Sequence, residues 1–337
     1  MSSRLQLVGG FAIDLLRQQT RNLGLLLALG AWLGFLAIKA PFYFTVDNFL
    51  VVGLQMAFIG IAATGMTLLM ISGNIDLSIG SMYAVAATAA ALASKATDPI
   101  LAVLVGMAVG GAIGLVNGIF VWRVKISPII VTLAALTAYR GVATLMTEGY
   151  GVQDVPQGFQ DFGQTRLLGV QTPIWCFVVS VILVWFVLTK RRVGRHIYAI
   201  GGNREASQAA GLRVRRIVIG LFFVNGVIVG LAAVLSASRL GTANPSFGVG
   251  LELDVITAVI LGGVAFSGGE GSLGGVVLAI LLIGNIGNGV IALGLDPAWT
   301  NVVKGGVLAA AVLLDQLSAE QRERFRTAVA MRERADA

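Results

Sequence analysis

The sequence KRRVGRHIYAIGGNREASQAAGLRVRR (residues 190–216) is a strongly basic segment between long apolar runs. It holds eight of the chain's 24 Lys and Arg residues, and its one acidic residue is Glu205. Lys and Arg are retained on the cytoplasmic side when a membrane protein inserts. The segment therefore predicts a cytoplasmic loop between two membrane-spanning helices.

A short helix is predicted inside this loop. Asn203 can cap its start, Glu205 falls in its first turn, and Gly211 can end it. Its alanines form a narrow face, which suits a groove on another protein better than lipid, because helices on a lipid surface carry bulky apolar side chains. A solvated connector is the alternative. The predicted docking residues are Gly202, Asn203, Arg204, Glu205, Ala206, Ala209 and Gly211.

The composition is that of an integral membrane protein. Of the 337 residues, 56% are hydrophobic and 12% are charged, whereas soluble domains are about 25% charged. We predict an all-α membrane protein with about ten spans, the short ones being re-entrant or broken helices. The predicted spans are residues 22–38, 49–71, 77–94, 99–121, 128–147, 173–189, 216–238, 252–266, 272–293 and 298–314.

The distribution of basic residues predicts the orientation. An even number of spans puts both termini on one side, with residues 1–21 as an N-terminal segment and 315–337 as a C-terminal tail. If that side is the cytoplasm, 18 Lys and Arg lie inside and four outside. We therefore expect a multi-pass protein of the plasma membrane with both termini cytoplasmic. The net charge of +7 then belongs to cytoplasmic segments, so nucleic acid is not an expected partner.

Two loops are expected on the outer side, residues 148–172 and 240–251. They are the natural docking surface for a molecule that arrives from outside, since long loops are usually functional. The alternative is that they only connect helices.

Several functional classes lack their motifs. The chain has no G-x-x-x-x-G-K-[ST] sequence, so it is not expected to bind ATP through a P-loop. Cys176 and His196 are each the single residue of their type, which excludes a disulfide framework and a His/Cys metal site. Without a catalytic constellation, we predict a protein that is not an enzyme and binds no cofactor or metal itself.

Glycines recur every four residues in two of the predicted spans. This spacing places them on one helix face, where two backbones can approach closely. We interpret the pattern as helix packing. The residues are Gly106, Gly110, Gly114 and Gly118 in one span and Gly226 and Gly230 in another.

Two connections on the predicted cytoplasmic side resemble each other and indicate an internal repeat. One reads ISGNIDLSIGSMYA (residues 71–84) and the other FSGGEGSLGGVVLA (residues 266–279). In the first, Asn74, Asp76 or Ser78 can cap the helix that follows. The alternative is that Asp76 lines a path or a gate.

Polar side chains within the spans are few and mostly uncharged. Such groups face the bundle interior or a water-filled cavity, and hydroxyls and amides suit a neutral polyhydroxy solute. Hydrogen bonds between helices are the alternative. The candidate translocation path consists of Asn74, Asp76, Ser78, Asn117, Asn225, Asn285 and Asn288. Arg140, also within a span, is expected to snorkel outward or to pair with Glu148.

The chain resembles the permease subunits of bacterial ABC importers for monosaccharides, the branch that takes up ribose, xylose or arabinose. The resemblance runs from about Phe49 to Asp315. Four segments carry it: GMTLLMISGNIDLSIGS, VNGIFVWRVKISPIIVTLAALTAYRG, RHIYAIGGNREASQAAGLRVRR and LELDVITAVILGGVAFSGGEGSLGG. It implies the ABC importer permease fold in the bacterial inner membrane.

The third segment is similar to the loop that docks such permeases onto their ATPase. Glu205, Ala206 and Gly211 fit the family's E-A-A-x-x-x-G core. Ser207 replaces the second alanine and no I-x-L-P tail follows, which fits the sugar branch rather than the larger importer classes.

The resemblance also implies the partners. These are a separate ABC subunit that binds ATP and Mg, a periplasmic or extracellular sugar-binding protein, and a second permease copy in a homodimer. Sugar would cross at the dimer interface by alternating access. The alternative function is an ion-coupled secondary transporter of a small neutral solute, and the expected lack of interior carboxylates disfavours it.

Overall fold

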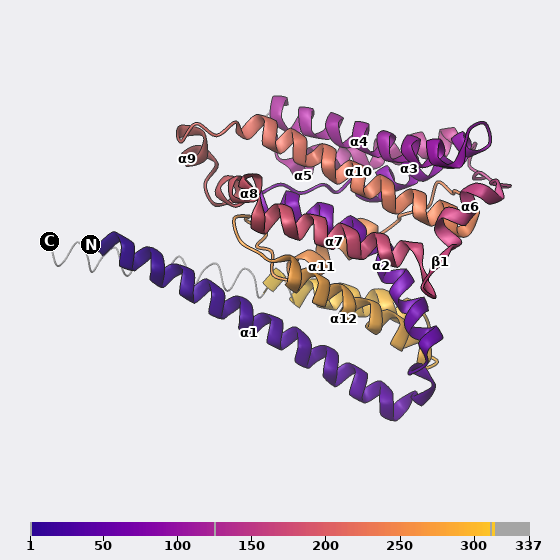
Figure 1. Ribbon diagram of the computed structural model, residues 1–337, viewed down its shortest axis with the longest axis horizontal. Helices are drawn as coiled ribbons and strands as arrows, with labels where there is room; N and C mark the ends of the chain where they lie inside the picture. The colour runs from indigo at the N-terminus through magenta and orange to yellow at the C-terminus, as the bar shows by residue number, and fades with distance from the viewer. Residues whose placement is uncertain (1, 125, 311, 314–337) are drawn as a thin grey trace.

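The long helices lie side by side in one bundle, as the computed structural model shows (Figure 1). The structure describes residues 2–124, 126–310 and 312–313, with side chains from residue 19 onward. The elements are α1 (Ser2–Lys39), η1 (Pro41–Tyr43), α2 (Val46–Ile71), α3 (Ile79–Ser94), α4 (Pro99–Val124), α5 (Pro128–Met146), α6 (Gln157–Gln164), β1 (Arg166–Leu167), β2 (Val170–Gln171), α7 (Thr172–Lys190), α8 (Arg192–Gly202), α9 (Arg204–Ala209), α10 (Val214–Leu240), α11 (Leu251–Leu261) and α12 (Leu273–Ala292).

The two ends of the bundle differ. One end carries α8 and α9, and we call it the α9 end; the other carries α6 and the hairpin formed by β1 and β2, and we call it the α6 end (Figure 1). Residues 298–310 are also helical, whereas the predicted tail at 315–337 lies outside the described residues.

Seven helices of the described chain are long and apolar enough to cross a membrane: residues 19–39 of α1, then α2, α4, α5, α7, α10 and α12. Two predicted spans are shorter. With 16 and 11 residues, α3 and α11 measure roughly 24 and 17 Å at 1.5 Å per residue, less than the roughly 30 Å of a hydrocarbon core. The prediction of some short helices is therefore confirmed.

The two glycine faces pack against each other. A Cβ atom added to Gly110 of α4 would collide with the carbonyl oxygen of Gly226 in α10, and a Cβ on Gly226 would collide with that of Gly110. Gly114 approaches the carbonyl of Phe222 in the same way. The predicted packing role is confirmed, because only glycine allows these backbones to come so close.

The centre of the bundle is formed by α2 and α10. In the apolar stretch of each, 56% of residues are buried, against 11% for α1. The first helix therefore lies on the outside, where it runs along α12 (Figure 1). There the indole Nε1 of Trp32 donates to the carbonyl oxygen of Asn285 at 3.0 Å.

The two predicted outer loops are joined at the α6 end. Val152 and Ala243 exchange backbone hydrogen bonds of 2.7 and 3.1 Å. The first loop, predicted without secondary structure, contains α6 and the hairpin. The second is not only a surface connection, because Gly248 packs against Gly80 at the start of α3.

Arg140 of α5 holds this second loop. Its guanidinium donates to the carbonyl oxygens of Pro245 and Phe247, the latter at 2.8 Å. Of the two expectations for Arg140, the pairing with Glu148 is not what the described residues show, whereas the guanidinium does reach the predicted outer loop. Carbonyl groups of a loop that enters the bundle satisfy the cation instead.

Candidate functional site

The basic segment at residues 190–216 folds into two helices, α8 and α9, of which the sequence predicted only α9. Asn203 caps α9 as predicted, because its side-chain Oδ1 accepts a hydrogen bond from the backbone N–H of Ala206 at 2.8 Å. After the helix, Gly211 adopts the left-handed conformation, with φ of +81°. In α8 the buried residues Gly194, Ile197 and Ile200 recur every three positions, a periodicity that could have predicted this helix.

The side of α9 that carries Ala206 and Ala209 is exposed, whereas Ser207 is buried against the bundle. Arg204 stacks over the indole ring of Trp122 in α4, with 4.8 Å between the guanidinium carbon and the ring centroid. Ser207 and Arg204 therefore anchor α9. Its alanine face is left exposed at the α9 end.

Four of the predicted path residues meet inside the bundle, and we call them the Asp76 cluster: Asp76, Ser78, Asn117 and Asn225. The carboxylate of Asp76 accepts hydrogen bonds from the backbone N–H of Ser78 at 2.9 Å and from its hydroxyl at 2.6 Å. The amide nitrogens of Asn117 and Asn225 each lie 3.4 Å from it. All four residues are at most 1% exposed, so these uncharged donors replace the water that a carboxylate needs.

The fold brings this cluster together from separate elements. The turn between α2 and α3 supplies Asp76 and Ser78, α4 supplies Asn117, and α10 supplies Asn225. Two further residues hold it: the hydroxyl of Tyr139 donates to Asn117 Oδ1 at 3.0 Å, and the backbone N–H of Leu77 donates to Thr132 Oγ1, also at 3.0 Å. The sequence analysis missed the role of Tyr139, because no pattern around Tyr139 indicates that its hydroxyl contacts Asn117, 22 residues away.

The predicted capping role and position of Asp76 need correction. Ser78 is the N-cap residue of α3 but makes no side-chain capping bond, and Asp76 braces the turn that precedes the helix. Its carboxylate is fully buried rather than at a cytoplasmic surface. The expectation that the interior lacks carboxylates is therefore wrong.

The other three predicted path residues lie apart from the cluster. Asn74 donates to the carbonyl and hydroxyl oxygens of Ser72 in its own turn. Asn285 Oδ1 accepts from the hydroxyl of Tyr43 at 2.9 Å; burial raises the pKa of Tyr43 to about 12, so the phenol keeps its proton. A path role for these residues stays a prediction.

Asn288 likewise lies near the α1–α2 connection. Its amide donates to Asn48 Oδ1 at 3.1 Å. Asn285 and Asn288 thus brace α12 against the segment around η1 and the start of α2.

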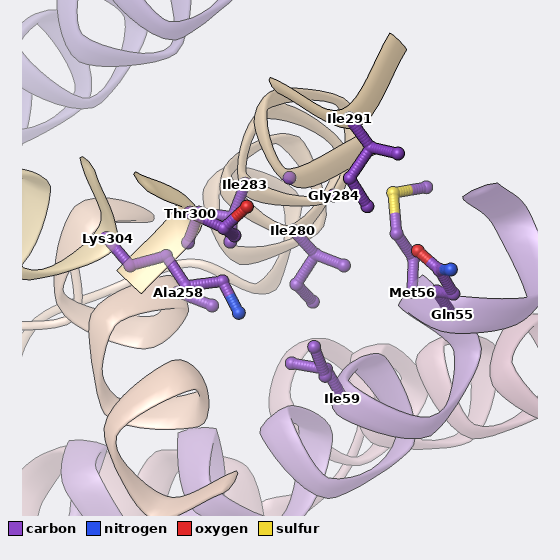
Figure 2. Close-up of a pocket in the computed structure, with 11 residues that line it drawn as sticks. Gln55, Met56, Ile59, Ala258, Ile280, Ile283, Gly284, Ile291, Thr300 and Lys304 are labelled. Atoms are coloured by element: carbon purple, nitrogen blue, oxygen red, sulfur yellow. The ribbon is translucent and has the colours of Figure 1, made fainter. Parts of the chain in front are cut away.

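A cavity of about 130 Å³ lies between α2, α11, α12 and the helical residues 298–310 (Figure 2). The ammonium of Lys304 at its edge pairs with the carboxylate of Asp254 at 2.7 Å. None of the seven predicted path residues lines it. The lining residues are Gln55, Met56, Ile59, Ala258, Ile280, Ile283, Gly284, Gly287, Ile291, Thr300 and Lys304.

Comparison with known proteins assigns the chain. Residues 46–312 match a family described as the permease component of branched-chain amino acid transport systems. The chain belongs to this permease family. The segment that forms α8 and α9 and the Asp76 cluster both lie within the matched residues of the permease. As a member of this family it is a transport subunit and not an enzyme.

Curated relatives of this permease are similar over most of their length. The ribose import permease protein of Bacillus subtilis (strain 168) is 36% identical over 302 residues, which cover 87% of this chain and 94% of that protein. The L-arabinose ABC transporter permease protein of Azospirillum brasilense is 36% identical over 288 residues, 85% of each chain. The D-allose transport system permease protein of Escherichia coli (strain K12) is 33% identical over 285 residues, 84% of this chain and 87% of that protein. No solved structure matches the chain.

Proposed function

We propose that this permease is the membrane subunit of an ATP-driven ABC importer that moves a monosaccharide into the cytoplasm by alternating access. The observation that carries the proposal is the similarity, over more than four fifths of the chain, to permeases named for ribose, L-arabinose and D-allose. The family description names branched-chain amino acids, but the similar proteins named here all carry sugar names. Those names favour the ATP-driven importer over the ion-coupled alternative.

The α9 end is the side on which we place the ATPase. Its small exposed face of alanines, anchored by Ser207 and Arg204, offers a handle that a protein groove can enclose. ATP and Mg would be bound by that partner, since the permease carries no P-loop.

We place the α9 end in the cytoplasm and the α6 end outside. The first observation that supports this is the basic charge of residues 190–216. The second is that α1 begins on the same side as α9 (Figure 1), which agrees with the cytoplasmic N-terminus that the distribution of basic residues predicts. A periplasmic or extracellular sugar-binding protein would deliver its ligand at the α6 end, and a second copy of the permease would complete the route across the membrane.

The test of the docking role is the Ala209→Trp variant, because a filled interface tolerates added bulk badly. We expect it to reach the membrane at the normal level, to lose co-purification of the ATPase, and to lose uptake of labelled ribose, arabinose and xylose. Gln208→Trp is the matched control. At 100° per residue, Gln208 points away from the side that Ala206 and Ala209 share.

The control should keep both co-purification and uptake. If Ala209→Trp still co-purifies with the ATPase and transports sugar normally, α9 is only a connector.

A further inference from the structure

Three segments that are far apart in the sequence meet backbone to backbone. They are the end of α2 with the turn that follows it, the last turn of α8, and the connection between α11 and α12. The backbone N–H of Gly269 donates to the carbonyl oxygen of Ile71 at 2.8 Å. We call this contact the glycine junction; its residues are Ile71, Gly73, Gly201, Gly268 and Gly269.

The junction joins the two connections whose sequences resemble each other. Gly73 follows Ser72 in the first repeat sequence as Gly268 follows Ser267 in the second. A Cβ atom added to Gly268 would lie 2.7 Å from the Cα atom of Gly73. Both glycines have left-handed φ angles, +74° and +85°, which other residues rarely adopt. The turn that ends α2 and the connection between α11 and α12 are therefore in direct contact.

The end of α8 is wedged into this contact. A Cβ on Gly201 would collide with the carbonyl oxygen of Ile71 and with the backbone nitrogen of Gly269. A Cβ on the next residue, Gly202, would have no atom of the described chain within 4 Å. Because close-packed groups transmit displacement, Gly201 cannot move without moving both turns.

Tyr198 makes a second link between α8 and the α11–α12 connection. Its hydroxyl donates to the carbonyl oxygen of Gly271 at 2.9 Å. Burial raises the pKa of the Tyr198 phenol, so the group remains a protonated donor. Helix α8 is thus fixed to this connection at two points.

On the far side of the junction, the turn after α2 runs directly into the Asp76 cluster. Two residues separate Gly73 from Asp76, whose carboxylate is held by side chains of α4 and α10. The other side of the junction is the connection between α11 and α12. Both α11 and α12 line the cavity beside the Lys304–Asp254 pair. Displacement of the junction therefore reaches all the helices at the centre of the bundle.

We infer that the glycine junction is the mechanical link through which movement of α8 and α9 is passed to the turns that hold α3 and α12, with Tyr198 and Gly201 as positioning residues. This inference rests on the proposed function, in which an ATPase moves α9. Docking and coupling are then separate properties: α9 provides the first and the junction the second.

The test uses the permease in complex with its ATPase, reconstituted with sugar-loaded binding protein. Gly201→Ala adds one methyl group at the junction, and Gly274→Ala adds the same group in open space at the start of α12. We expect Gly201→Ala to keep ATPase binding and basal ATP hydrolysis, and to lose sugar-stimulated hydrolysis and uptake by on the order of tenfold. Gly274→Ala should behave as the wild type.

Tyr198→Phe keeps the ring and removes only the hydroxyl. It therefore tests the link between α8 and the α11–α12 connection if Gly201→Ala fails to assemble. We expect stimulated hydrolysis to fall roughly fivefold with basal hydrolysis unchanged, as for the loss of one hydrogen bond. If Tyr198→Phe, or an assembled Gly201→Ala complex, is stimulated as strongly as Gly274→Ala, the junction is not the link. If the wild-type complex itself shows no sugar-stimulated hydrolysis, the proposed function fails instead.

Discussion

Asp76 illustrates what a single residue reveals about this permease. A buried carboxylate is unfavourable unless hydrogen bonds replace its water, and here the donors come from Ser78, Asn117 and Asn225. The sequence identified these residues as polar and interior. The contact between them could not be predicted, because Asn117 and Asn225 lie 41 and 149 residues from Asp76 in the sequence. Spatial proximity of this kind has no local signal.

The Asp76→Ala variant should be less stable than the wild type by about 1–3 kcal/mol, because the buried donors around it lose their acceptor. The measurement is thermal unfolding of the detergent-solubilised protein. Ser94→Ala is the matched control, since within the described residues the buried hydroxyl of Ser94 bonds only to the carbonyl of Ala91 in its own helix. Equal melting temperatures for the two variants would show that the cluster does not stabilise the fold.

At the scale of elements, the predictions that succeeded depended on local chemistry. The cap at Asn203 and the glycine stop at Gly211 involve residues within one short helix, so α9 was predicted closely. By contrast, α8 and α6 were missed. Their mixed polar sequences read as loop, and they are helical because one face packs on the bundle or on a neighbouring loop.

The packing of α4 on α10 gives a second prediction. Gly110→Ala should destabilise the protein by about 1–3 kcal/mol, because the added methyl group meets the backbone of Gly226. Gly220→Ala, also in α10, adds the methyl in open space, so it should be neutral or stabilise by up to about 1 kcal/mol. Unfolding in detergent measures both. A Gly110→Ala protein as stable as the Gly220→Ala protein would contradict the packing role.

For the whole molecule, the sequence predicted an all-helical membrane fold with short helices, because hydropathy and length follow directly from the bilayer as a solvent. It did not predict that the loop after α10 descends to Gly80, or that the turn after α2 touches the connection between α11 and α12. Both contacts join segments that are distant in the sequence. They depend on how the helices are arranged, which hydropathy does not encode.

The orientation of the molecule can be tested by chemical labelling. In a Cys176→Ser background, Gln157→Cys should react with a membrane-impermeant maleimide in intact spheroplasts, since it lies exposed at the α6 end. Gly202→Cys should react only after the membrane is opened, because it lies at the α9 end among retained basic residues. Reaction of Gly202→Cys in intact spheroplasts would reverse the proposed topology.

The position of α1 has a consequence for biosynthesis. Its Trp32 bonds to Asn285 of α12, 253 residues later in the chain. At synthesis rates of roughly 5–20 residues per second, that partner emerges on the order of 10 to 50 s after Trp32. During this interval α1 has to persist in the bilayer without its partner, which its apolar residues 19–39 permit. The first helix of the described chain to be translated is thus among the last to reach its packed position, and a chain arrested before α12 would leave it unpaired in the lipid.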